Sequence, residues 1–96
     1  MAIRFSRASV RDLEDIRAHT LREFGPVQEQ RYLEGLRHHL ELLEQFPRSA
    51  PLYRRGGSLR VSTYQSHRVF YRDDGGGIAV KRIVHHARDL DRIVGR

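Results

Sequence analysis

Basic side chains that could act on an anionic partner gather in the last third of the chain. Arg68 and Arg72 lie in one apolar run, and Lys81, Arg82 and His85 lie in the next. Such residues can clamp phosphates and, with Tyr, stack on bases. They could also perform RNA transesterification, with Arg stabilising the phosphorane charge and His or Tyr transferring protons. The alternative is a solvated surface that keeps a sheet edge from aggregating.

A β-hairpin is predicted to hold these side chains at fixed spacing. Residues 67–72 and 78–85 form two runs with the β-branched and aromatic content of strands. The acidic, glycine-rich segment 73–77 that joins them is typical of a hairpin turn. Paired strands fix the distances between cations, which a flexible tail does not do.

Alternation along each strand predicts which residues share a face. In the first strand, one face is expected to hold Arg68, Phe70 and Arg72, opposite Val69 and Tyr71. In the second strand, one face is expected to hold Ile78, Val80, Arg82 and Val84.

Arg82 therefore has two possible roles. Among apolar neighbours, its stem could pack while its guanidinium pairs with Asp12, Asp15 or Asp89. It could instead face the ligand, like the other arginines of the hairpin.

Charge is distributed unevenly between the two parts of the chain. Residues 1–53 contain 8 Arg and 8 Asp or Glu, whereas residues 54–96 contain 10 Lys or Arg and 4 Asp or Glu. The whole net charge of +6 is therefore carried by the C-terminal part. A one-sided basic field favours nucleic acid or an acidic protein segment as partner. The alternative is that the basic residues only keep the protein soluble and reflect a composition biased toward arginine, since 17 of the 18 basic residues are Arg.

The remaining elements suggest an α+β domain spanning residues 1–96. A short strand at residues 3–5 precedes Ser6, which is placed to cap a first helix, and Gly25-Pro26 is expected to end that helix. A second helix is expected from Pro26 to Gln45, then a loop at 47–58 and a strand at 59–64. The predicted order is β-α-α-β-β-β: an antiparallel helical hairpin packed on a small, mostly antiparallel sheet. Asp89 could cap a last helical turn.

Several function classes are disfavoured by the composition. The chain has no Cys, hence no disulfide framework or thiolate ligand, and its six His lack metal-binding spacing. No glycine-rich phosphate loop precedes a helix, so no metal or cofactor is expected. No signal peptide or membrane span is apparent, and we expect a soluble cytoplasmic protein.

In order and spacing, the chain resembles the RelE/ParE superfamily of toxins from type II toxin–antitoxin modules. Its N-terminal part carries Ser6-x-x-Ser9-x-x-Asp12-Leu13-x-x-Ile16. The C-terminal blocks Ser66-His67-Arg68-Val69-Phe70-Tyr71-Arg72 and Val80-Lys81-Arg82-Ile83-Val84-His85-x-x-x-Asp89 are similar to signatures of the ParE branch. Two residues depart from the family pattern: Arg7, where Pro is usual, and Val84, where Leu is usual.

The resemblance implies two possible functions. ParE-like members have no nuclease activity and inhibit DNA gyrase, whereas RelE-like members are ribosome-dependent mRNA endonucleases. A nuclease would use Arg68, Arg82 and His85, but the chain lacks the RelE-type lysine pair and has no Tyr after Tyr71. We therefore prefer the ParE-like function, for which no catalytic residues are expected. The residues expected to bind the target are Arg68, Arg72, Arg82, His85 and Arg88.

The resemblance also implies a protein partner. In either branch, a cognate antitoxin wraps the toxin with its C-terminal segment, a helix lying against the helical hairpin and an extended piece on the sheet. The targets implied are DNA gyrase for the ParE reading and the ribosome with its mRNA for the alternative.

Overall fold

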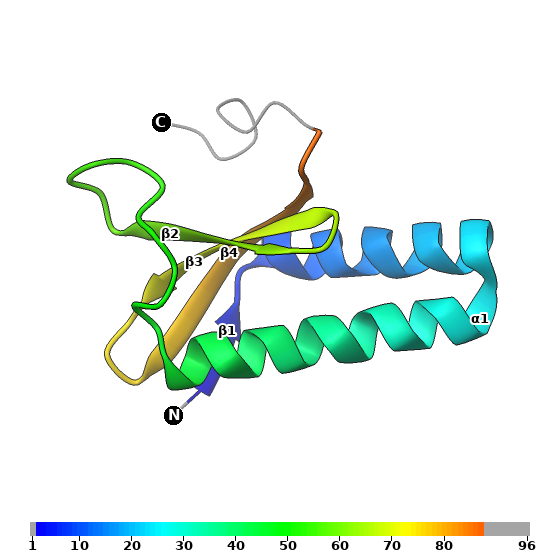
Figure 1. Ribbon diagram of the computed structural model, residues 1–96, viewed down its shortest axis with the longest axis horizontal. Coiled ribbons are helices and arrows are strands. Elements are labelled where there is room, and N and C mark those ends of the chain that lie inside the picture. Colours follow the sequence, from blue (N-terminus) through cyan, green and yellow to red (C-terminus); the bar gives the residue numbers. More distant parts are fainter. Residues whose placement is uncertain (1, 88–96) are drawn as a thin grey trace.

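The computed structural model describes residues 2–87, which form an α+β structure of two layers. A bent helical element, α1 (Arg7–Gln45), covers one face of a four-stranded sheet (Figure 1). The expected α+β architecture is confirmed. The predicted Asp89 cap lies outside the described residues, as does Arg88.

Two antiparallel arms make up α1 (Figure 1). The backbone of Gly25 leaves the helical region, with φ 86° and ψ 174°, and Pro26 follows it inside the element. A hydrogen-bonded ion pair of 3.1 Å joins Arg17 Nε of the first arm to Glu29 Oε2 of the second. The sequence predicted two helices here. The structure has a single helical element bent at the predicted position, because Gly tolerates the positive φ and Pro needs no N–H donor at the start of the second arm.

The N-terminus of α1 is capped as the sequence predicted. Ser6 Oγ accepts a hydrogen bond of 3.0 Å from the Ser9 backbone N–H. On the first arm, Ile16 and Thr20 are buried, whereas Val10 and Phe24 are exposed. The end of the first arm thus extends beyond the sheet that covers its middle.

The sheet is mixed and has the order β1-β4-β3-β2. Its strands are β1 (Ala2–Phe5), β2 (Leu59–Tyr64), β3 (His67–Asp73) and β4 (Gly77–His85). β1 pairs with β4 in parallel, and the β2–β3 and β3–β4 pairs are antiparallel. β1 reaches only the first part of β4, from Gly77 to Val80, so within residues 2–87 the rest of that edge of β4 has no neighbouring strand.

The core lies between α1 and one face of the sheet. It combines Ile16, Leu36, Leu40 and Leu43 of α1 with Val69, Tyr71, Ile78, Val80 and Ile83 of the strands. The Tyr71 hydroxyl donates a hydrogen bond of 2.8 Å to the carbonyl oxygen of Pro47 and so ties the segment after α1 to this core. Because Val69 and Tyr71 are in this cluster, the faces predicted for β3 are correct.

The faces predicted for β4 are wrong. Tyr71 pairs with Val80 but Phe70 pairs with Arg82, so β4 contains one extra residue at this point. This bulge reverses the alternation: Ile78 and Val80 face the core, and so does Ile83. Arg82 therefore does not share a face with Ile78 and Val80.

Gly77 allows β1 to approach β4 closely. Its φ is 150°, and a Cβ atom built on it would overlap the backbone of Ala2. We predict that Gly77→Ala lowers the free energy of unfolding by about 2–4 kcal/mol, as measured by urea denaturation. Gly76→Ala is the matched control, because a Cβ at the neighbouring residue meets nothing within 4 Å. Equal stability of the two variants would contradict this account of the β1–β4 contact.

Candidate target-binding surface

The β4 bulge brings cationic residues of two strands onto one face of the sheet. Lys81 follows the core residue Val80, and Arg82 precedes the core residue Ile83, so both side chains point away from the core. They join Arg68 and Arg72 of β3, which alternate with core residues and flank Phe70. We call the surface that Arg68, Arg72, Lys81 and Arg82 make around the buried Phe70 the arginine face.

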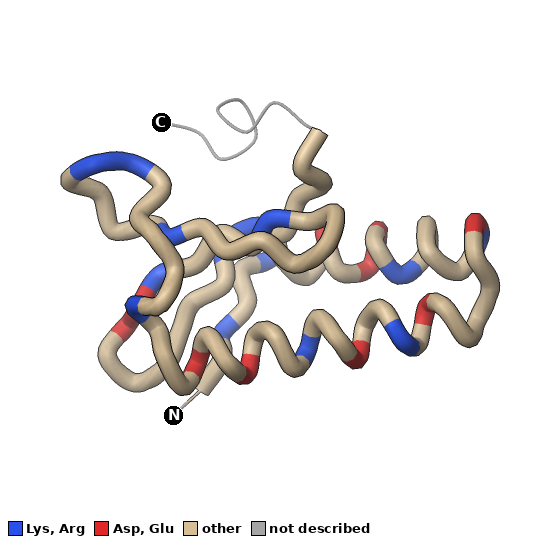
Figure 2. The backbone as a smooth tube through the Cα atoms, viewed as in Figure 1, with Lys and Arg blue, Asp and Glu red and all other residues tan. Residues whose placement is uncertain are grey.

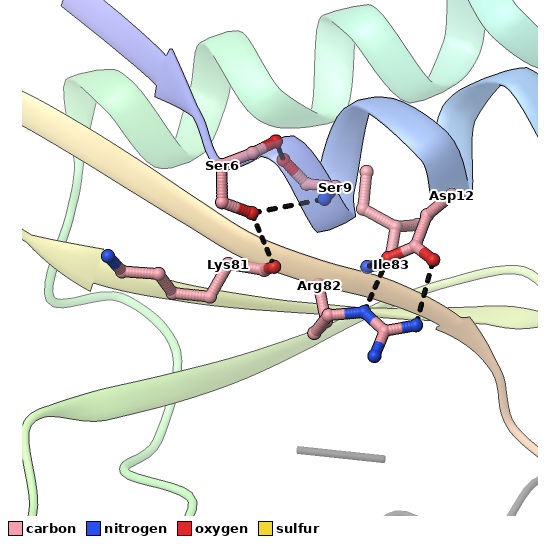
Figure 3. Close-up of polar contacts among 6 residues, drawn as sticks. All are labelled: Ser6, Ser9, Asp12, Lys81, Arg82 and Ile83. Atoms are coloured by element: carbon pink, nitrogen blue, oxygen red, sulfur yellow. Dashed lines mark hydrogen bonds and ion pairs between the residues drawn. The ribbon is translucent and has the colours of Figure 1, made fainter. Parts of the chain in front are cut away.

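A carboxylate from α1 fixes Arg82 (Figure 3). Arg82 donates from Nε to Asp12 Oδ2 at 2.8 Å and from Nη2 to Asp12 Oδ1 at 2.9 Å. The backbone N–H of Ile83 donates to the same Oδ2, also at 2.8 Å. These hydrogen bonds from Arg82 to Asp12 raise the pKa of its guanidinium above its ordinary value. Of the three acidic partners that the sequence offered, Asp12 binds Arg82, whereas Asp89 lies outside the described residues.

The other two arginines of this face have different environments. Arg72 is exposed, whereas Arg68 is half-buried. In the part of the chain that the structure describes, Arg68 Nε is buried and has no hydrogen-bond partner. A buried donor without a partner is uncommon in proteins and calls for an acceptor.

The loop before β2 adds to the same face. The Tyr53 ring packs edge-on against Phe70, with 5.1 Å between ring centroids, and the Arg54 guanidinium lies 5.0 Å from the centre of the Tyr53 ring. Figure 2 shows basic positions at the tip of this loop and across the sheet, whereas basic and acidic positions alternate along α1.

Acidic side chains near the sheet are paired away from this face. Asp73 Oδ2 accepts a hydrogen bond from Arg48 Nε at 3.1 Å, and Asp74 Oδ2 accepts one from Arg4 Nη2 at 2.6 Å. The backbone N–H of Gly75 lowers the pKa of Asp73, and the hydrogen bond from Arg4 lowers that of Asp74. Both carboxylates are therefore ionised at neutral pH. Each is paired with an arginine that lies outside the arginine face.

His85 lies on the opposite side of the sheet from the arginines. It pairs with His67 across β3 and β4, and the two ring centroids are 5.6 Å apart. Both histidines line a cleft of about 750 Å³ between α1 and the sheet, together with Asp12, His19 and Tyr32. The structure thus unites Arg68, Arg72 and Arg82 but separates His85 from them.

Tyr32 and His67 form the polar centre of this cleft. The Tyr32 hydroxyl lies 2.6 Å from His67 Nδ1. Burial, and then the neighbouring His85, lower the pKa of His67 to about 4, so this ring is neutral at pH 7. Burial also raises the pKa of Tyr32. Neither group carries charge at neutral pH.

Residues 3–90 match the family described as "ParE toxin of type II toxin-antitoxin system, parDE". The chain belongs to the ParE toxin family. A solved structure titled "Chromosomal ParDE TA system from P. aeruginosa" superposes with a TM-score of 0.75 at 20% identity, over 88% of this chain and 95% of that one. A search of curated proteins gave no significant match.

Within residues 2–87, no group of His, Asp or Glu is arranged to hold a metal ion. No helix in this range is long and apolar enough to cross a membrane. The target-binding set predicted from the sequence did not include Lys81, and it is the bulge that brings Lys81 to the same face as Arg82.

The Asp12 contacts predict a large loss of stability when this carboxylate is removed. We expect Asp12→Ala to lower the free energy of unfolding by about 2–4 kcal/mol, because it leaves Arg82 and the buried Ile83 N–H without their acceptor. Asp15→Ala is the control, since Asp15 is an exposed acid of the same helix and should change stability by less than about 0.5 kcal/mol. Chemical denaturation of both variants measures the difference, and similar losses would show that Asp12 has no special role.

The depressed pKa of His67 predicts a pH dependence of stability. The unfolded chain binds a proton at this ring below about pH 6.5, whereas the folded chain does so only near pH 4. Stability from this group is therefore present above pH 6.5 and is lost as the pH falls toward 4, by about 1–2 kcal/mol after allowance for solvent screening. His67→Gln should flatten the slope between pH 6.5 and 4.5 in urea denaturation series. An unchanged slope would contradict the assignment.

Proposed function

We propose that this ParE-family protein is a toxin that inhibits DNA gyrase and thereby arrests growth in the cytoplasm. The observation that carries the proposal is the separation of the basic residues from the groups able to transfer protons. Arg68, Arg72 and Arg82 share one face, whereas His85 and His67 line the cleft on the other side. This arrangement supports a surface that binds a target rather than one that cleaves RNA.

The alternative, a ribosome-dependent mRNA endonuclease, would use Arg68, Arg82 and His85 together. Arg82 is hydrogen-bonded to Asp12, and His85 projects from the opposite side of β4. General acid–base catalysis needs the proton-transferring group within hydrogen-bond reach of the reacting atoms. The described residues do not favour such a site.

A cognate antitoxin is the second partner that we propose. The cleft between α1 and the sheet is lined in part by Phe24, which is 67% exposed, and Val27 near the same bend is 64% exposed. An exposed apolar patch beside a cleft is typical of a surface that another protein covers. An amphipathic antitoxin helix would bury these side chains.

A supercoiling assay tests the proposed function. Relaxed plasmid is incubated with gyrase, ATP and the purified full chain, while a parallel reaction contains ribosomes and mRNA. We expect supercoiling to be lost and cleaved plasmid to accumulate, with intact mRNA. Addition of the cognate antitoxin should restore supercoiling. Intact supercoiling together with cleaved mRNA would refute the proposal.

A further inference from the structure

We infer that the arginine face contacts the phosphate backbone of duplex DNA. The inference rests on the proposed function, because gyrase acts on DNA and its inhibitor therefore works beside a duplex. It identifies what the basic surface binds in that setting. The protein surface of gyrase itself is not required for this contact.

The spacing of the cations suits a phosphate backbone. Arg68 and Arg72 are four residues apart on one strand, which places them about 13 Å apart at the usual rise of a strand. Lys81 lies on the neighbouring strand beside the Phe70–Arg82 pair, between them. One DNA strand carries a phosphate about every 3.4 Å along the axis, so this patch matches roughly four phosphates.

Among the cations of the arginine face, Arg82 is paired with Asp12, whereas Arg68, Arg72 and Lys81 have no acidic partner within residues 2–87. Residues 54–87 contain 7 Lys or Arg and only Asp73 and Asp74 as acids, and both acids bind arginines from residues 1–53. The side chains of Arg72 and Lys81 have no hydrogen bond or ion pair within residues 2–87. An external anion would supply what these groups lack.

The aromatic residues favour contact with the backbone over contact with unpaired bases. Proteins that bind single strands expose aromatic rings on which bases stack. Here Phe70 is fully buried, and one neighbour of the Tyr53 ring is the Arg54 guanidinium, 5.0 Å from its centre. The face offers charge without a free stacking platform, as expected for a surface that binds phosphates of a duplex.

Fluorescence anisotropy with a labelled 20-base-pair DNA duplex tests the inference. The test variant is Arg72→Gln with Lys81→Gln, which removes two charges and keeps the stems. The matched control is Arg31→Gln with Arg37→Gln, two exposed arginines on the second arm of α1. We expect the test variant to bind at least about 10-fold more weakly at 0.1 M salt and to lower the slope of log K against log salt by about two. The control should bind like the unmodified protein, and circular dichroism checks that both variants are folded.

Three results would overturn the inference. They are absence of duplex binding by the unmodified protein at low salt, equal weakening in the test and control variants, and at least 10-fold tighter binding to an RNA duplex of the same sequence. The supercoiling assay separates this inference from the proposed function. If a test variant that no longer binds DNA still inhibits gyrase, the inferred DNA contact is wrong and the proposed function stands. If the protein binds DNA but does not inhibit gyrase, the proposed function is wrong and the DNA contact stands.

Discussion

The carboxylate of Asp12 at the open edge of β4 is the contact on which the rest of the structure depends. β1 ends opposite Val80, so the next backbone groups of β4 lack a neighbouring strand in the described part of the chain. Side chains of the helix layer replace it: Ser6 Oγ donates to the Lys81 carbonyl oxygen at 2.7 Å, and Asp12 accepts from the Ile83 N–H. Since unpaired buried backbone groups are costly, these two contacts stabilise the bulge and set the position of α1 over the sheet.

Most of the fold could be predicted from the sequence, because strong local signals mark its boundaries. Gly25-Pro26 combines a residue that tolerates positive φ with one that begins helices, and the structure bends there. The bulge could not be predicted in this way. Ile78, Val80, Ile83 and Val84 are all apolar, so strict alternation and a shifted alternation fit β4 equally well. Only the pairing with β3 and the contact with Asp12 decide between them.

The same shift determines how much of the site could be predicted. Arg68 and Arg72 were placed correctly relative to each other because β3 alternates regularly. The predicted target-binding set combined His85 with the arginines, whereas the structure places His85 on the other side of the sheet. The pairing of Arg82 was foreseen only as a choice among three acids. The choice depends on the register of α1 against the sheet, which no local pattern specifies.

The two sides of the sheet have different chemistry but share one residue. The arginine face is charged, whereas the cleft opposite contains the uncharged pair Tyr32 and His67. Asp12 lines that cleft and also holds Arg82 and the Ile83 backbone. A partner seated in the cleft therefore meets the carboxylate that fixes β4 at its bulge. The bulge in turn sets where Lys81 points, so the geometry of the charged face depends on a residue that is reached from the other side.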